Sequence, residues 1–186
     1  MKELSLNILD ITENSVKAGA GLTEIILEET DDNLKITIRD DGCGMDPETV
    51  KAVTDPFYTT RTTRKVGMGV PLLKLAAEQT GGSFKISSVS EKDSPADHGT
   101  EVIAEFNKNH LDFTPLGDIV STITTLIQGH PDTDFLYTHT YAGACVSLDT
   151  REIREVLEGV PLDTYEVINW IGENLNEQYS ENFPDQ

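Results

Sequence analysis

Hydrophobic residues recur with helical spacing at the start of the chain and with a period of two further on. From residue 3 to about residue 18, one helical stripe is apolar or small and a second is entirely polar, which predicts an amphipathic helix. Residues 23–28 and 34–39 alternate as strands do, and an Asp-Asp-Asn turn joins them. The polar stripe of the helix comprises Asn7, Asp10, Asn14 and Lys17.

Two more helices and a second strand pair are predicted in the first half of the chain. Asp46-Pro47 has the form of an N-cap followed by a first-turn proline, which starts a short helix. Residues 70–79 are predicted to form a helix, and residues 84–90 and 100–106 a closing strand pair. Between the helices, residues 54–69 combine threonines, basic side chains and glycines, a composition that predicts a mobile lid.

The last part of the chain has the pattern of a different module. Apolar residues at helical spacing from 116 to 127 predict a helix, and two short strands follow at about 135–140 and 144–148. Acidic N-cap motifs at Asp149 and Asp163, each with a glutamate three residues later, predict two final helices. The order of this module is therefore α-β-β-α-α.

These elements predict an α+β fold with two parts. Residues 1–107 are expected to form a two-layer α/β sandwich, and residues 108–186 a small acidic α/β extension. The formal net charge is −19 overall, with −8 on the first part and −11 on the second. Because this charge would repel a phosphate backbone or an anionic surface, neither nucleic acid nor a membrane is an expected partner.

The cysteines and the hydropathy pattern bear on location. Cys43 and Cys145 lie far apart and lack the paired spacing of a metal site or a disulfide framework. The N-terminus has no signal-peptide core, and no run of about 18 apolar residues could span a bilayer. We expect a cytoplasmic protein.

Candidate chemistry begins on the polar stripe of the first helix. Asp10 and Asn14 are four residues apart, so they project from one helix face one turn apart. The amide oxygen of Asn14 suits a magnesium ion held mainly by water and phosphates, and Asp10 could orient or deprotonate an attacking water. The alternative is a solvated helix face with no ligand.

A second candidate is Asp40, at the end of an apolar strand face. The period of two that places Leu34, Ile36 and Ile38 on one face aims the Asp40 carboxylate to the same side, where it needs a donor. The exocyclic amine of adenine is such a donor, and Gly42 and Gly44 would let a flat ring approach the backbone. The alternative is that the Asp-Asp-Gly-Cys-Gly stretch is only a turn.

A third candidate is Gly67-Met68-Gly69, directly before the helix that begins near Val70. Backbone amides at a helix N-terminus bind phosphate groups. Two glycines also occur in ordinary loops, so the motif has little specificity by itself.

Together these elements resemble the nucleotide site of the GHKL superfamily, which includes histidine-kinase catalytic domains, gyrase and MutL ATPases. The resemblance covers residues 1 to about 107 and implies the Bergerat fold. The N box and first glycine box are most similar to MutL proteins, and the F box and lid to histidine kinases. The matching stretches are Leu9–Ala20 for the N box, Arg39–Met45 and Val66–Leu72 for the two glycine boxes, Asp55–Arg61 for the F box, and His98–Thr100 beside the phosphates.

The resemblance implies roles for individual residues. Asn14 would bind Mg²⁺, Asp40 the adenine of ATP, and Asp10 would take the position of the catalytic acid residue. Lys17 and Thr100 would contact the phosphates, Gly67 to Gly69 would line the lid, and its basic side chains are further phosphate candidates: Arg61, Arg64 and Lys65. Two departures stand out: aspartate replaces the longer glutamate usual at position 10, and Lys65-Val66 replaces the leading glycine pair of the kinase lid.

Three functions remain open on this basis. The first is a slow regulatory ATPase or ATP-gated switch that acts on a protein partner of unknown identity, with a homodimer as one option. The second is a protein kinase acting in trans, similar to anti-sigma serine kinases or a detached histidine-kinase catalytic domain. The third is an ATP-binding module without turnover. Each histidine is interpreted as an ordinary surface or packing residue: His98, His110, His130 and His139.

Overall fold

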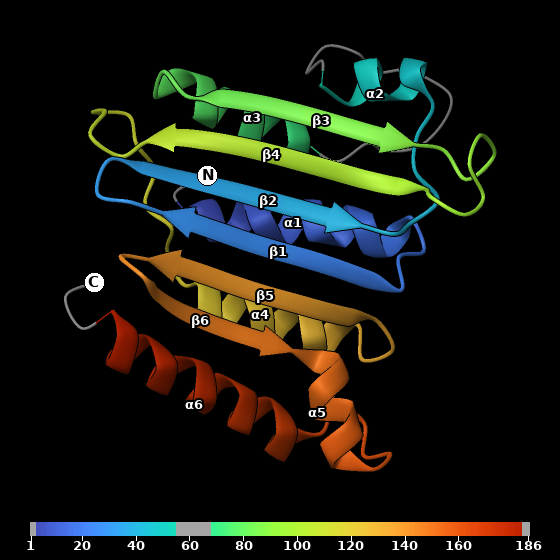
Figure 1. The fold of residues 1–186 in the computed structure, drawn as a ribbon, viewed down its shortest axis with the longest axis vertical. Coiled ribbons are helices and arrows are strands. Elements are labelled where there is room, and N and C mark those ends of the chain that lie inside the picture. Colours follow the sequence, from blue (N-terminus) through green and yellow to red (C-terminus); the bar gives the residue numbers. More distant parts are fainter. Residues whose placement is uncertain (1–2, 55–67, 184–186) are drawn as a thin grey trace.

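The computed structural model describes residues 3–54 and 68–183. The described part of the chain forms one mixed sheet with helices on one face (Figure 1). The helices are α1 (Leu4–Lys17), α2 (Pro47–Thr54), α3 (Gly69–Gln79), α4 (Ile119–Gly129), α5 (Thr150–Leu157) and α6 (Tyr165–Asn182). The strands are β1 (Leu22–Glu29), β2 (Asn33–Asp40), β3 (Ser83–Val89), β4 (Gly99–Asn107), β5 (Asp134–Tyr141) and β6 (Ala144–Asp149).

The six strands are ordered β3-β4-β2-β1-β5-β6 across the sheet. All neighbours are antiparallel except β1 and β5, which run parallel from the pair Leu22 and Asp134 to the pair Glu29 and Tyr141. This parallel pairing attaches the strands of the acidic extension to the first four strands. The α+β architecture expected from the pattern is confirmed, and residues on both sides of position 107 share one sheet.

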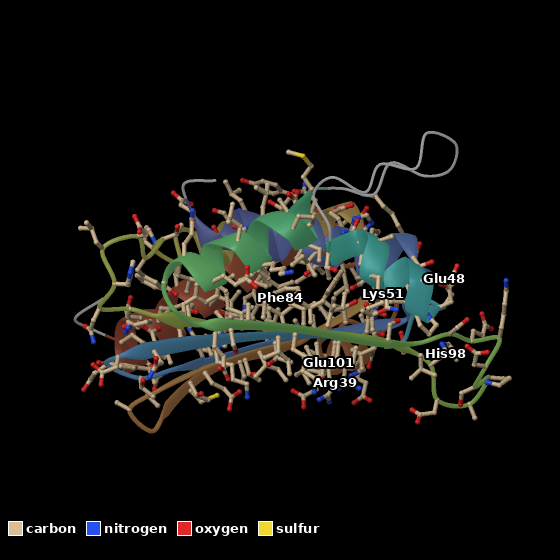
Figure 2. The ribbon with its side chains drawn as sticks, turned by 90° about the horizontal axis from the view of Figure 1, so that it is seen from above. Arg39, Glu48, Lys51, Phe84, His98 and Glu101 are labelled. Atoms are coloured by element: carbon tan, nitrogen blue, oxygen red, sulfur yellow. The ribbon has the colours of Figure 1, made fainter. Side chains whose placement is uncertain are left out.

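One hydrophobic core lies between the sheet and its helices. Leu4 and Ile8 of α1 belong to the same buried cluster as Phe135 and Tyr137 of β5, so the core runs through both parts of the chain. The opposite face of the sheet is open: Figure 2 shows Arg39 and Glu101 on this face, and Phe84 toward α3. The sheet therefore has the one-sided burial typical of antiparallel sheets. None of the described helices is long and apolar enough to cross a membrane.

Two of the three predicted N-caps are confirmed. The carboxylates of Asp46 and Asp149 accept hydrogen bonds from the backbone N–H groups of Thr49 and Arg151, at 2.8 and 2.9 Å. The prediction of an N-cap at Asp163 is wrong, because Thr164 occupies that position of α6. The Thr164 hydroxyl donates to the carbonyl of Pro161 at 2.7 Å, so the preceding turn continues to Thr164 and the helix starts one residue later.

Candidate functional site

The carboxylate of Asp40 is held by neutral donors at the end of β2. The Ser15 hydroxyl donates to it at 2.6 Å, and the backbone N–H groups of Gly42 and Thr100 donate at 3.0 and 3.2 Å. Within residues 3–54 and 68–183, no basic side chain forms an ion pair with Asp40. Among the described residues, the half-buried carboxylate is therefore held by neutral donors alone.

The loop after β2 has no room for a side chain at Gly42 or at Gly44. A side chain at Gly42 would place its Cβ 2.9 Å from the Cβ of Ala18 on α1. Gly44 has a φ of +64°, and a Cβ there would lie 1.8 Å from the carbonyl oxygen of Val89. The ring of His98 holds the loop from the other side, with Nδ1 2.6 Å from the carbonyl oxygen of Gly42.

A cavity of about 420 Å³ opens between α1, the glycine loop and the ends of α2 and α3. Four of the residues predicted to contact a nucleotide line it together: Asn14, Lys17, Gly44 and Thr100. Apolar side chains from several elements form much of the remaining wall: Ile11, Met45, Val53, Val70, Ile86 and Val102. The cavity thus combines an apolar wall with a few polar groups, as small-molecule sites do.

Asp40 itself is not among the residues that line this cavity. Two of its three donors, Ser15 and Thr100, are lining residues, whereas Asp40 borders a second hollow of about 260 Å³ together with His98. Gly42 is also absent from the lining and supports the loop beside Asp40. The carboxylate that is predicted to bind adenine is therefore adjacent to the cavity, one hydrogen bond away from two of its lining residues.

Asp10 lies on α1 against the start of α3. A Cβ on Gly69 would be only 2.8 Å from the Cβ of Asp10, so the two helices approach here as closely as a glycine allows. Met68, the N-cap residue of α3, is 71% exposed. Asp10 is exposed as well, and the described part of the chain gives it no hydrogen-bond partner. The remaining predicted residues, Arg61, Arg64, Lys65 and Gly67, lie outside the described residues.

Sequence reasoning missed two hydroxyl groups that organise the site. Ser15 lies on the apolar or small stripe of α1, yet it makes the shortest hydrogen bond to Asp40. Ser88 accepts from the N–H of Met45 at 2.8 Å, donates to the carbonyl of Gly99 at 2.9 Å, and lies 2.9 Å from the Thr100 hydroxyl. A serine within an otherwise apolar stripe was the available signal for Ser15. Nothing in the sequence distinguished Ser88.

Comparison with known proteins gives a family and several relatives. The family model described as "Histidine kinase-, DNA gyrase B-, and HSP90-like ATPase" matches residues 2–110. Sporulation kinase C of Bacillus subtilis is 29% identical over 96 residues, which cover 50% of this chain and 22% of that protein. The signal transduction histidine-protein kinase AtoS of Escherichia coli is 28% identical over 89 residues, 48% of this chain and 14% of that protein. The chain spans less than a quarter of the length of the curated relatives it matches.

Solved structures extend the likeness of fold beyond the matched segment. The MutL ATPase domain of Aquifex aeolicus complexed with ADP superposes with a TM-score of 0.55 at 16% identity, covering 85% of this chain and 70% of that one. The N-terminal domain of a DNA repair protein gives a TM-score of 0.54 at 18% identity, covering 80% and 53%. At these identities the likeness concerns the fold. Since the family model covers more than half of the chain and the site residues converge on one cavity, the chain belongs to the histidine kinase-, DNA gyrase B- and HSP90-like ATPase family.

Proposed function

We propose that this protein binds Mg-ATP in the cavity beside Asp40 and acts as a slow regulatory ATPase or ATP-gated switch. The observation that carries the proposal is the convergence of Asn14, Lys17, Gly44 and Thr100, from three separate segments, on that one cavity. A carboxylate offers about four acceptor sites, and three are used by Ser15, Gly42 and Thr100. Asp40 can thus accept one further N–H, which the exocyclic amine of adenine would supply.

The other end of the nucleotide would lie along α1 toward the start of α3. Lys17 and the Thr100 hydroxyl are suitable phosphate donors, and the backbone amides of Met68 and Gly69 lie at a helix N-terminus, which favours anions. Asn14 fits a magnesium ion, because its amide oxygen is a hard ligand on the cavity wall. The ion would reduce the negative charge of the phosphates.

Hydrolysis would depend on Asp10. It lies one turn from Asn14 on α1, exposed and beside the start of α3, where it can orient a water and accept its proton. Aspartate is one methylene shorter than glutamate, so its carboxylate is set farther from the reacting atoms and general-base catalysis weakens. We therefore expect slow turnover, as suits a switch.

The acidic extension would couple the nucleotide state to a partner. Both parts of the chain share one sheet and one core. We therefore propose that the division near residue 107 is one of function, with the nucleotide site before it and the partner contact after it. Nε2 of His130, in the extension, lies 2.7 Å from Oε1 of Glu13, the neighbour of Asn14 on α1. A movement of α1 would therefore act directly on the extension through this contact. The partner would be a protein or a second copy of the chain.

A protein kinase acting in trans is the second candidate. Sporulation kinase C and AtoS are kinases by name, and this chain matches only a fraction of each. In this alternative the cavity would bind ATP in the same way, but the γ-phosphoryl group would pass to a side chain of another protein.

Calorimetry with ATP and GTP in magnesium buffer tests the shared part of these proposals. ATP should bind with micromolar to millimolar affinity and GTP more weakly, because guanine places an acceptor oxygen opposite Asp40. Equal affinities, or no binding of either, would overturn the adenine site. Phosphate release in the absence of a partner then supports the switch, and labelled phosphate on a partner protein supports the kinase. Binding without either indicates a non-hydrolysing module.

A further inference from the structure

Side chains of α5 and α6 line an apolar groove. Figure 1 shows these two helices beyond the β6 edge of the sheet. Its volume is about 550 Å³. Apolar side chains form most of its wall: Ile153, Val156 and Leu157 from α5, and Val167 and Trp170 from α6. The nucleotide cavity lies at α1, α2 and α3, and the two share no lining residue.

The groove belongs to an unusually apolar surface. Val156 is 82% exposed and Trp170 is 52% exposed, and Val160 and Tyr165 of the same segment are 47% and 73% exposed. These four account for nearly half of the nine large hydrophobic side chains that are exposed among the described residues. Exposed apolar side chains concentrated in one segment, two of them on the wall of an apolar groove, are typical of an interaction site.

The surroundings of the groove are strongly acidic. The segment from residue 150 to residue 182 carries eight acidic side chains and two arginines. Both arginines are already engaged: Arg151 Nη2 lies 2.6 Å from Asp149, and Arg154 Nε lies 2.7 Å from Asp134. The two glutamates that line the groove, Glu152 and Glu166, are exposed and form no ion pair within the described ranges 3–54 and 68–183.

We propose that the α5–α6 groove is the docking site for a basic amphipathic helix of a partner protein. An apolar channel between two helices accepts the apolar stripe of a third, and lysines or arginines beside that stripe would meet Glu152 and Glu166. A second copy of this chain would bring acidic residues against acidic residues. An anionic membrane would be repelled in the same way.

The sole tryptophan of the protein, Trp170, lines the groove and reports on its occupancy. The probe is a synthetic 16-residue helical peptide with leucines on one face and lysines elsewhere. A matched peptide carries glutamates in place of the lysines, and a third has the leucines and lysines in scrambled order. The lysine peptide should shift the emission of Trp170 to shorter wavelength in a saturable way at 0.15 M salt. The other two peptides should bind at least tenfold more weakly.

Variants separate docking in the groove from general attraction to an acidic protein. Val156→Lys replaces a side chain that is 82% exposed, so the fold should tolerate it, and it should weaken the lysine peptide roughly tenfold. Glu152→Lys combined with Glu166→Lys should do the same. Matched controls lie elsewhere: Leu111→Lys changes an apolar side chain that is 97% exposed, and Glu91→Lys an exposed acid. Both should leave the affinity within twofold.

Several results would overturn the proposal. These are equal binding of the lysine and scrambled peptides, an equal loss of affinity in Leu111→Lys, and a shift of Trp170 caused by anionic vesicles but not by the peptide. A dimer in sedimentation that Val156→Lys converts to monomer would assign the groove to a second copy instead. The groove does not depend on the nucleotide site, so these outcomes are independent of whether ATP binds.

Discussion

Two carboxylates lie at opposite ends of the β1–β2 pair and have contrasting neighbours. Asp40, paired with Thr23 at one end, receives hydrogen bonds from neutral donors. Glu29, paired with Leu34 at the other end, lies 2.5 Å from the Lys108 ammonium and 2.8 Å from Nε2 of His139. Its side chain is 9% exposed, and that of His139 is fully buried.

The neighbouring groups determine whether the charge of each carboxylate is compensated within the protein or is available to a ligand. Burial opposes ionisation of Glu29, but the hydrogen bonds with His139 and Lys108 outweigh it, so the pKa of Glu29 lies below its ordinary value. Its charge is compensated within the protein. Asp40 has no such compensation among the described residues, so it can contribute both charge and an acceptor to a ligand. A carboxylate with neutral donors is thus suited to binding a ligand, and one beside a lysine ammonium is suited to holding the fold together.

The Glu29 cluster also fixes the acidic extension to the sheet. His139 Nδ1 lies 2.8 Å from the hydroxyl of Tyr179 on α6, and that hydroxyl lies 2.5 Å from the hydroxyl of Tyr137 on β5. Burial and the neighbouring Tyr179 raise the pKa of Tyr137 well above its ordinary value, so this phenol stays neutral as part of the chain of hydrogen bonds. Glu29, β5 and α6 are therefore linked through one partly buried network of hydrogen bonds.

The largest expected effect is on stability, in Glu29→Gln. The change removes the negative charge beside Lys108 and the buried His139, which should lower the free energy of unfolding by about 3 kcal/mol. ATP affinity should stay within a few fold. Urea unfolding measures the free energy of unfolding, and calorimetry measures the ATP affinity. Glu28→Gln is the matched control, because Glu28 forms an exposed ion pair with Lys35 and should cost less than about 1 kcal/mol. Equal losses in the two variants would contradict the assignment.

For Asp40→Asn, in contrast to Glu29→Gln, the main effect should be on ATP affinity and not on the free energy of unfolding. The amide cannot accept at both oxygen positions, so ATP affinity should fall by about 1 to 3 kcal/mol, or roughly 5- to 150-fold. Asp41→Asn is the control, since Asp41 accepts from the N–H groups of Gly21 and Leu22 and is not assigned to the nucleotide. In calorimetry, Asp40→Asn should bind ATP much more weakly than Asp41→Asn does. The opposite rank would remove Asp40 from the adenine site.

A smaller effect is expected on the acid limb of the stability curve. Because the folded-state pKa of Glu29 is lowered, its contribution is present above the unfolded value of about 4.5 and is lost as the pH falls through the folded pKa. Stability of the wild type should therefore decline below about pH 4.5 more steeply than that of Glu29→Gln. Urea midpoints between pH 3 and 6 measure the difference. Parallel curves would show that Glu29 is not compensated in the folded state.

Much of the fold was predictable because its elements depend on local signals. Alternation over residues 34–39 set the strand that ends at Asp40, and Asp46-Pro47 set the start of α2. The parallel pairing of β1 with β5 was not predictable, because it joins segments more than 100 residues apart and leaves no local pattern. The sequence therefore predicted the module of residues 108–186 but not that it completes the same sheet.

The candidate site was predictable for a related reason. Asp40 followed from the period of its strand, and Asp10 and Asn14 from helical spacing, so geometry along one element sufficed. The Glu29 cluster escaped notice, and its histidine was interpreted as ordinary, because its partners lie 79 and 110 residues away in the chain. Contacts between distant elements, such as Ser88 with Thr100, need the register of the sheet before they can be inferred.

The smallest effect on binding is expected for Asp10→Asn. This variant tests whether the ATP that binds beside Asp40 is hydrolysed. Asp10 is exposed and has no hydrogen-bond partner among the described residues, so ATP affinity should change by less than about 1 kcal/mol. Hydrolysis should nevertheless be lost, because an amide cannot accept the proton of the attacking water. Asp10→Glu should retain hydrolysis and speed it up, since the longer side chain moves the carboxylate closer to the water. Phosphate release under saturating ATP, with calorimetry on the same samples, separates binding from turnover. Wild-type turnover in Asp10→Asn would show that another group activates the water, while a wild type without turnover would favour the trans-kinase alternative over the ATPase.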